Sequence, residues 1–173
     1  MLVVMIGLPG TGKSTIAGEI AKTLNAVVVN KDDVRRAVFE PSVLDYSAAQ
    51  DDLCMEMIYS AVGYIVTQWP EKVVIIDGRT YSRRQHVQRL LEVAESLAIT
   101  PYCIECVCEE EVARKRLGHL PGISSHPAAN RNLELYRTLR AEMEPLEIPR
   151  LSIDTGVLSL SEAVSQSIEY LKS

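Results

Sequence analysis

Eight residues near the start of the sequence have the spacing of a phosphate-binding loop, Gly7-Leu8-Pro9-Gly10-Thr11-Gly12-Lys13-Ser14. They follow an apolar run at residues 2–6, which is typical of a buried strand. Glycines in such a loop let successive backbone N–H groups face a polyphosphate, and the helix that follows adds the positive end of its dipole. We therefore expect nucleotide binding through Gly10, Thr11, Gly12, Lys13, Ser14 and Thr15.

Two side chains of this loop have chemical tasks in phosphoryl transfer. Lys13 is expected to lie along the β and γ phosphates as a point charge, and the Ser14 hydroxyl to bind the Mg²⁺ that bridges them. A second metal-binding residue is predicted at Asp77, which follows the apolar run at residues 72–76; its alternative role is a cap of the next turn. The expected cofactors are ATP and Mg²⁺, and Asp77 and Arg79 are also expected to contact the substrate.

A second polar stretch, Asn30-Lys31-Asp32-Asp33-Val34-Arg35, follows the apolar residues 27–29. Because α/β sheets bind ligands at the carboxyl ends of their strands, Asp32 is expected to face the phosphate loop and to orient an acceptor hydroxyl. The alternative for Asp32 is a helix N-cap, a role that Asp33 takes if the helix starts one residue later. Arg35 is either a substrate contact or a solvated residue of the helix expected over residues 33–39.

Residues 118–127 combine many turn-forming residues without hydrophobic periodicity, which indicates a lid at about residues 117–132. Arg116 and Arg131 bracket this segment. Both are expected to close on the transferring phosphoryl group as an arginine finger does, and each has the alternative role of a surface charge.

Five apolar runs predict β-strands, at residues 2–6, 27–29, 72–76, 102–108 and 151–154. The first three are continuous, which predicts strands buried on both faces. Capping boxes that open helices are predicted at Ser47-x-x-Gln50, Ser82-x-x-Gln85 and Ser159-x-x-Glu162. The expected fold class is α/β, with three layers, a five-stranded parallel sheet covered by helices on both faces and a small lid, in a single domain over residues 1–173.

The composition limits the classes of function. The 173 residues are 47% hydrophobic, with no leader-like segment and no apolar run of membrane-spanning length, which predicts a cytoplasmic protein without a membrane partner. The 18 basic and 23 acidic residues give a net charge of -5, which disfavours a dedicated nucleic-acid binder. In Cys103-x-x-Cys106-x-Cys108, strand alternation separates Cys103 from the other two, so core thiols are favoured over a metal site.

Taken together, these motifs resemble the P-loop kinases of the nucleoside-monophosphate-kinase-like group along the whole chain. The order is a phosphate loop, Asp32-x-x-Arg35, Asp77 after a strand, an arginine-bearing lid and Thr155 after the last strand. The first two motifs are similar to those of polynucleotide 5′-hydroxyl kinases and zeta-toxin-type kinases, and adenylylsulfate kinases share Asp-x-x-Arg. The resemblance implies that Asp32 accepts the proton of the acceptor hydroxyl, that Arg35 contacts an anionic group of the acceptor, and that Thr155 shapes the adenine pocket.

The resemblance implies an ATP-dependent phosphotransferase that moves the γ-phosphoryl group onto a hydroxyl of a small molecule or nucleotide. A polynucleotide 5′-hydroxyl kinase and a nucleotide-gated binding protein are the alternatives. Residues 30–33 also fit the N-K-x-D box of GTPases, but in GTPases that box follows a much later strand. Residues 118–130 lack the lysine-rich signature of adenylylsulfate kinases, and the sequence leaves the acceptor and the oligomeric state open.

Overall fold

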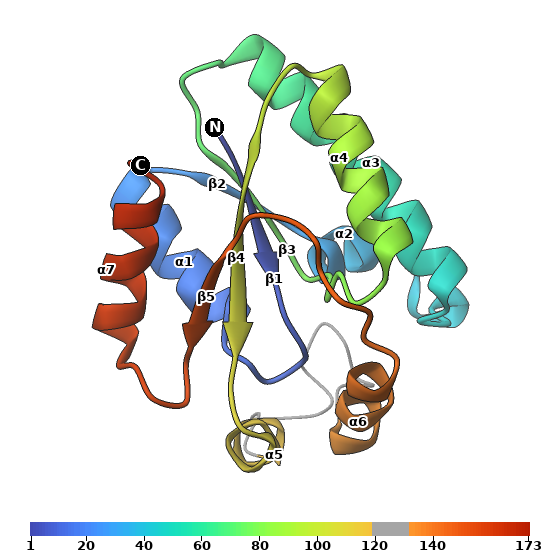
Figure 1. The fold of residues 1–173 in the computed structure, drawn as a ribbon. Helices are drawn as coiled ribbons and strands as arrows, with labels where there is room; N and C mark the ends of the chain where they lie inside the picture. Colours follow the sequence, from blue (N-terminus) through green and yellow to red (C-terminus); the bar gives the residue numbers. More distant parts are fainter. Residues whose placement is uncertain (119–131) are drawn as a thin grey trace.

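The computed structural model describes residues 1–118 and 132–173 (Figure 1). Within this part, five parallel strands form one sheet in the order β2-β3-β1-β4-β5. Their bounds are Leu2–Ile6 for β1, Val27–Asn30 for β2, Val74–Asp77 for β3, Pro101–Val107 for β4 and Leu151–Asp154 for β5. The α/β class and the five-stranded parallel sheet predicted from the sequence are confirmed.

Helices connect the strands and cover both faces of the sheet. Their bounds are Lys13–Leu24 for α1, Lys31–Val38 for α2, Pro41–Val43 for the 3₁₀ helix η1, Ala48–Gln68 for α3, Arg84–Ser96 for α4, Glu110–Gly118 for α5, Leu133–Ala141 for α6 and Leu160–Tyr170 for α7. In Figure 1, α1 and α7 cover one face, α3 and α4 cover the other, and α5 and α6 lie beyond the carboxyl ends of the strands. None of the helices in the described residues is long and apolar enough to cross a membrane.

The core consists of two apolar clusters on opposite faces of the sheet. On β1, Val3 and Met5 pack with residues of α1 and α7, whereas Val4 and Ile6 pack with residues of α3 and α4. All four side chains are fully buried. Because β1 lies in the middle of the sheet and is covered on both faces, every position of the strand is apolar. The loop that follows β1 is therefore anchored at the centre of the molecule.

Strand β2 forms, but it is not the buried strand that its continuous valines predict. Val27 and Val28 are 36% and 39% exposed, since β2 lies at the edge of the sheet beside β3. An apolar run indicates a strand without giving its place in the sheet, and only strands inside the sheet have neighbours on both sides. The predicted burial of this strand is therefore wrong.

The cysteines of β4 lie on opposite faces of the sheet, as alternation predicts. Cys103 belongs to the cluster under α3 and α4, and Cys106 to the cluster under α1 and α7. Burial raises the pKa of the Cys103 thiol to about 11 and that of Cys106 to about 12, so both are protonated at neutral pH. Cys54 is also buried, while Cys108 lies just beyond β4 and is half-buried. These cysteines therefore serve as small packing groups.

Of the three predicted capping boxes, the one at Ser159 is complete. At Ser47 only the serine half forms, because the Ser47 N–H donates to Asp45 instead of Gln50. The Ser47 hydroxyl accepts a hydrogen bond from the backbone N–H of Gln50 at the start of α3. Ser159 and Glu162 exchange both hydrogen bonds of a capping box at the start of α7. Each cap satisfies an N–H group that lacks a partner within its own helix.

The third predicted cap, at Ser82, is wrong. Helix α4 begins at Arg84, whose backbone N–H donates to the Glu144 carboxylate at 2.5 Å. The Glu144 N–H in turn donates to the Ser82 carbonyl at 2.9 Å, and Arg83 pairs with Glu142 at 2.7 Å. A segment that is distant in the sequence thus replaces the local cap. We call this joint between residues 82–84 and 142–144 the α4 clasp.

Gly7 ends β1 in a conformation that favours glycine. Its φ is +132°, and a Cβ there would overlap the carbonyl oxygen of Cys106 on β4. Gly18, within α1, has no atom within 4 Å of the place that a Cβ would take, apart from its own helix backbone and chain neighbours. The two glycines therefore form a matched pair for substitution.

We predict that Gly7→Ala lowers the free energy of unfolding by roughly 2–5 kcal/mol, because backbone strain and overpacking add. Gly18→Ala should raise it by about 0.5–1 kcal/mol, because alanine is the better helix former. Urea unfolding of both variants measures the two effects. A Gly7→Ala variant as stable as the wild type would contradict the close approach of this loop to β4.

Candidate active site

The phosphate loop turns from β1 into α1 at the centre of the sheet. Gly12, the N-cap of α1, has a φ of +87°, a left-handed conformation that glycine adopts without strain. Lys13 is 6% exposed, and its ammonium group donates a 2.8 Å hydrogen bond to the carbonyl of Leu8. The Thr11 hydroxyl donates to the same carbonyl at 2.8 Å. These bonds fold the loop back on itself around the positive end of α1.

A cavity of about 530 Å³ lies beside this end of α1. Its lining includes six of the predicted nucleotide-binding residues, Gly10, Gly12, Lys13, Ser14, Thr15 and Thr155. Leu158 and Leu160 add apolar surface. Thr11 is 2% exposed, and its hydroxyl is turned toward Leu8. Backbone donors, a cation and an apolar wall together suit a nucleoside polyphosphate. We call this space the nucleotide cavity.

Arg116 lies on the nucleotide side of the phosphate loop. Its guanidinium donates to the Thr155 hydroxyl at 2.8 Å, to the Thr155 carbonyl at 2.7 Å and to the Gly10 carbonyl at 3.3 Å. The Thr155 hydroxyl donates in turn to the Thr11 carbonyl at 2.8 Å. Helix α5, the phosphate loop and the loop after β5 are thereby joined. The role of Arg116 at the transferring phosphoryl group stays a prediction.

Part of the predicted lid cannot be placed in this arrangement. Arg131 lies outside the described residues, as does the lid between residues 119 and 131. The ends of that segment are described: α5 closes at Gly118, and α6 opens at Leu133 with Asn132 as its N-cap.

Asp77 ends β3 beside the end of β2, where it pairs in register with Asn30. The carboxylate is 1% exposed, and its Oδ2 accepts a 2.7 Å hydrogen bond from the Asn30 amide. Its Oδ1 is buried without a hydrogen-bond partner among the described residues. A buried carboxylate oxygen in that state suits a water or a hydrated cation. The Oδ1 atom of Asp77 therefore fits the predicted Mg²⁺, which binds proteins through few ligands and keeps several waters. The part of the Ser14 hydroxyl in that site stays a prediction.

The helix that carries Asp32 is capped by Asn30, not by either aspartate. Helix α2 begins at Lys31, two residues earlier than predicted, and the Asn30 Oδ1 accepts from the N–H groups of Asp32 at 2.8 Å and Asp33 at 3.3 Å. The cap roles considered for the two aspartates are therefore wrong. Asn30 was missed as a functional residue, although asparagine is among the preferred N-cap residues and directly precedes the helix.

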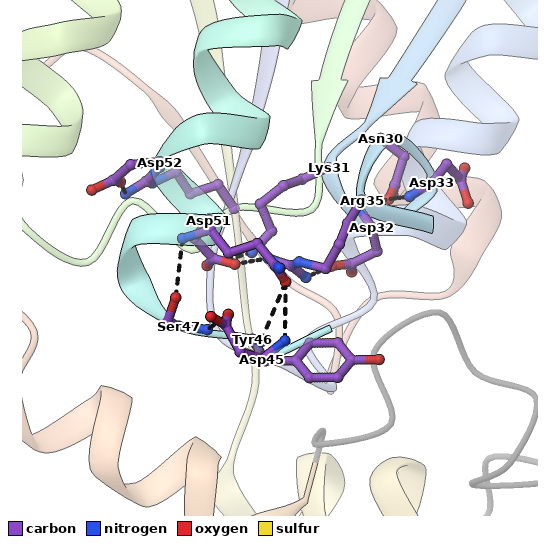
Figure 2. Close-up of polar contacts among 12 residues, drawn as sticks. Asn30, Lys31, Asp32, Asp33, Arg35, Asp45, Tyr46, Ser47, Asp51 and Asp52 are labelled. Atoms are coloured by element: carbon purple, nitrogen blue, oxygen red, sulfur yellow. Dashed lines mark hydrogen bonds and ion pairs between the residues drawn. The ribbon is translucent and has the colours of Figure 1, made fainter. Parts of the chain in front are cut away.

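A cluster of buried ion pairs joins α2 to α3 (Figure 2). Arg35 is 1% exposed, so its predicted alternative as a solvated residue is wrong. It pairs with Asp32 at 3.0 Å and with Asp51 of α3, and Asp51 also accepts from Lys31 at 2.6 Å. The Tyr46 ring lies over the Arg35 guanidinium, with 5.2 Å between the carbon and the ring centroid. We call these five residues the α2–α3 ion cluster.

Asp51 and Tyr46 were also missed by the sequence analysis. In the sequence, Asp51 fits an ordinary acidic residue in the first turn of a helix, which the helix dipole favours. Only the packing of α3 against α2 gives it a cationic partner on each of two positions of α2. Tyr46 has a positive φ of +52°, which no local motif signals.

A second cavity, of about 240 Å³, also has Lys13 in its lining. Its lining combines the charged residues of α2 and α3 with residues that follow β3, among them Lys31, Asp32, Arg35, Asp51, Asp52 and Arg79. Leu135 and Leu139 of α6 add an apolar wall. Lys13 lines both this space and the nucleotide cavity. We call it the acceptor cavity, because the two spaces meet at the side chain predicted to bind the β and γ phosphates.

Comparison with known proteins places this arrangement in a family. A family model described as an AAA domain matches residues 2–145. The chain belongs to this family. No curated protein matches the sequence of this AAA domain.

Solved structures with a similar fold include several kinases. A candidate kinase from Chloroflexus aurantiacus has a TM-score of 0.77 and 20% identity, over 98% of this chain and 97% of its own. A gluconokinase from Sinorhizobium meliloti has a TM-score of 0.69 and 17% identity, over 99% of this chain and 91% of its own. APS kinase CysC of Mycobacterium tuberculosis, in complex with AMPPNP and APS, has a TM-score of 0.70 and 18% identity, over 99% of this chain and 98% of its own. The AAA domain thus has the P-loop kinase-like fold of these structures.

One further side chain of the AAA domain enters the acceptor cavity from α4. His86 is half-buried, and its Nδ1 has no hydrogen-bond partner within the described residues. Burial, followed by the positive charges of Arg79, Arg83 and Lys31, lowers the pKa of His86 from its ordinary 6.5 to about 4, against an opposing contribution from Asp52. The imidazole is therefore neutral at physiological pH. The sequence alone indicates only a solvated helix face for His86, because its surroundings depend on the packing of α3 against α4.

We predict that the His86 imidazole titrates near pH 4 in the folded protein. Since folding lowers this pKa, the unfolded state binds more protons between about pH 6.5 and 4. The contribution of His86 to stability is therefore fully present above pH 6.5 and is lost as the pH falls toward 4. Histidine-selective NMR, with the resonance assigned by His86→Gln, measures the pKa. A midpoint near 6.5 would contradict the buried, electropositive environment.

Proposed function

We propose that this protein transfers the γ-phosphoryl group of ATP to a hydroxyl group of a small acceptor. The observation that carries the proposal is the position of Lys13, which lines both the nucleotide cavity and the acceptor cavity. A donor phosphate bound by Lys13 would be separated from the acceptor cavity, which includes Asp32, by the Lys13 side chain alone. A protein that only binds or hydrolyses a nucleotide has no need of this second polar cavity.

On the donor side, the backbone of the phosphate loop and the end of α1 would bind the phosphates, and Lys13 would leave the Leu8 carbonyl to lie along them. Ser14 and Asp77 would hold Mg²⁺, the latter through the Oδ1 atom or a water on it. When bound there, the metal would supply positive charge that offsets the negative charge of the phosphates. Thr155 and Arg116 would hold the loop in place from the adenine side.

On the acceptor side, Asp32 would orient the hydroxyl and accept its proton. The acceptor oxygen forms a bond to the γ phosphorus as the bond from that phosphorus to the β–γ bridging oxygen breaks, and ADP leaves. Arg35 is a positioning residue in this scheme, because its ion pair fixes the Asp32 carboxylate on the first turn of α2. Phosphoryl transfer depends mainly on such positioning and charge stabilisation.

The size and charge of the site support a small acceptor over a polynucleotide. The acceptor cavity has a volume of about 240 Å³, close to that of a small ligand site. The chain carries 18 basic residues against 23 acidic ones, and many of its arginines are paired with carboxylates along helix faces. An extended phosphate backbone usually meets a continuous basic track.

The proposal includes two further points, namely that residues 1–173 form a single domain and that the protein acts in the cytoplasm.

The direct test is a screen of ATP consumption with Mg²⁺ against a panel of hydroxyl metabolites and 5′-hydroxyl oligonucleotides. We expect turnover that depends on an added small acceptor. A preference for oligonucleotides would favour the polynucleotide kinase, and hydrolysis that ignores every acceptor would favour a nucleotide-gated binding protein.

The first prediction for this proposal concerns Lys13→Met, which keeps the length of the side chain and removes its charge. Because the ammonium group would meet the transferring phosphate, kcat should fall at least ~100-fold, the usual scale for loss of one charge-stabilising donor. The control is Lys22→Met, at a side chain that is 74% exposed on the same helix. Turnover of Lys13→Met within a few-fold of the wild type would exclude the assigned role of the loop.

The second prediction concerns Asp32→Asn, which keeps the shape of the side chain and removes its basicity. Transfer should fall at least ~100-fold while the affinity for AMPPNP, measured by calorimetry, stays within a few-fold. Asp33→Asn is the matched control, since Asp33 is the next residue of α2 and its side chain is 63% exposed. Equal activity in the two variants would show that Asp32 has only a structural role in the α2–α3 ion cluster.

A further inference from the structure

The acceptor cavity continues into a space between α3 and α4. This second space has a volume of about 260 Å³. It shares Asp52, Arg79, Gln85 and His86 with the acceptor cavity, so the same four side chains line both. We call it the α3–α4 cleft. An acceptor with its hydroxyl at Asp32 therefore has room for a second group beyond Arg79.

The cations of the acceptor cavity differ in how fully they are compensated. Arg35 is paired with both Asp32 and Asp51, and Lys31 with Asp51. The α2–α3 ion cluster thus contains two cations and two carboxylates. Two carboxylates therefore offset the positive charge of Arg35. The Arg35 Nε is buried without a hydrogen-bond partner among the described residues, and the contact of Arg35 with an anionic group of the acceptor stays a prediction.

The positive charge of Arg79 is offset less than that of Arg35. Its side chain is 8% exposed, and one nitrogen donates to Asp52 at 2.6 Å. The Asp52 side chain is 56% exposed, so solvent screens this pair. The Arg79 Nε is buried without a hydrogen-bond partner in the part of the chain that the structure describes. A buried guanidinium in this state is stabilised by an anion that brings a second set of acceptor atoms.

The other basic side chain of the cleft is already paired. Arg89 donates two hydrogen bonds to the Glu56 carboxylate, at 2.8 and 2.7 Å. Burial is the largest cause of the lowered pKa of His86, and the positive charges of Arg79, Arg83 and Lys31 lower that pKa further, against Asp52. The Nδ1 of His86 is a second buried polar atom without a partner in the described residues, and His86 belongs to the lining of the same cleft.

We infer that the α3–α4 cleft binds an anionic group of the acceptor, a carboxylate or a phosphate, against the guanidinium of Arg79 and the imidazole of His86. The inference rests on the proposed function for the identity of the ligand. It defines the substrate class as a small molecule with a hydroxyl at one end and an anionic group at the other. Asp52, which is half-exposed, would turn toward solvent as the anion takes its place on Arg79.

The test uses inorganic phosphate and acetate as probes of the two anion chemistries. Mg²⁺ and AMPPNP at saturation occupy the phosphate loop, and sodium chloride keeps the ionic strength constant. We expect calorimetry to show saturable binding of at least one of the two anions, and Arg79→Met to weaken it about tenfold or more, as loss of a charged hydrogen bond does. The control is Arg84→Gln, because the Arg84 side chain is 67% exposed and lies outside the cleft.

Two further measurements keep the result interpretable. Arg79→Lys retains the positive charge and serves as a second variant in case Arg79→Met fails to fold. It should bind the anion more tightly than Arg79→Met does. If Arg79→Met does not fold, the expected result is weaker binding by Arg79→Lys than by the wild type. The pKa of His86, followed by NMR, should rise when the anion binds, because a negative charge favours the imidazolium. This second readout reports on the cleft alone and needs no phosphoryl transfer.

Absence of saturable binding of both anions, or equal binding in the wild type and Arg79→Met, would overturn the inference. Binding that leaves the His86 pKa unchanged would also overturn it, since the anion would then lie elsewhere. Failure of the proposed function has a different signature, namely no AMPPNP binding or no acceptor-dependent turnover, with the effect of the anion on His86 still present.

Discussion

The side chain of Asn30 joins the two halves of the candidate site. Its amide nitrogen donates to Asp77 at the metal side, and its amide oxygen caps α2, the helix that carries Asp32 and Arg35. Asp77 is buried, so breaking the first bond would leave another carboxylate oxygen unsatisfied, at a cost of about 1–3 kcal/mol. The start of α2 is therefore fixed relative to β3. Helix α2 contributes Lys31, Asp32 and Arg35 to the lining of the acceptor cavity.

The parts of the fold that the sequence predicts well are those with a local physical cause. The phosphate loop is recognisable because glycines, a lysine and a serine stand at fixed spacing after a buried strand. Alternation predicted the opposite faces of Cys103 and Cys106, and the caps at Ser47 and Ser159 follow from hydrogen bonds within one helical turn. The exposure of Val27 and Val28 was not predictable in this way, because the order of strands in a sheet is a property of the whole chain.

The acceptor side was predicted less completely because its character comes from charges on different elements. Asp32 and Arg35 lie one helical turn apart, and the sequence identified both. Asp51, Asp52 and His86 acquire their roles only when α3 packs beside α2 and α4. A charged residue on an amphipathic helix usually faces solvent, so the sequence favours exposure for each of them. Their convergence on one cavity is the information that only the three-dimensional structure supplies.

The α4 clasp has a consequence for how the molecule opens. Helix α6 supplies the apolar wall of the acceptor cavity, and the residues just after it hold the first turn of α4 through Glu142 and Glu144. Moving α6 outward therefore strips a cap from α4, which carries His86 on the opposite side of the same cavity. The two walls should exchange their amide hydrogens as one cooperative unit, with the sheet below remaining protected. An outward movement of α6 would in this sense be a sub-global unfolding event rather than the swing of a single helix.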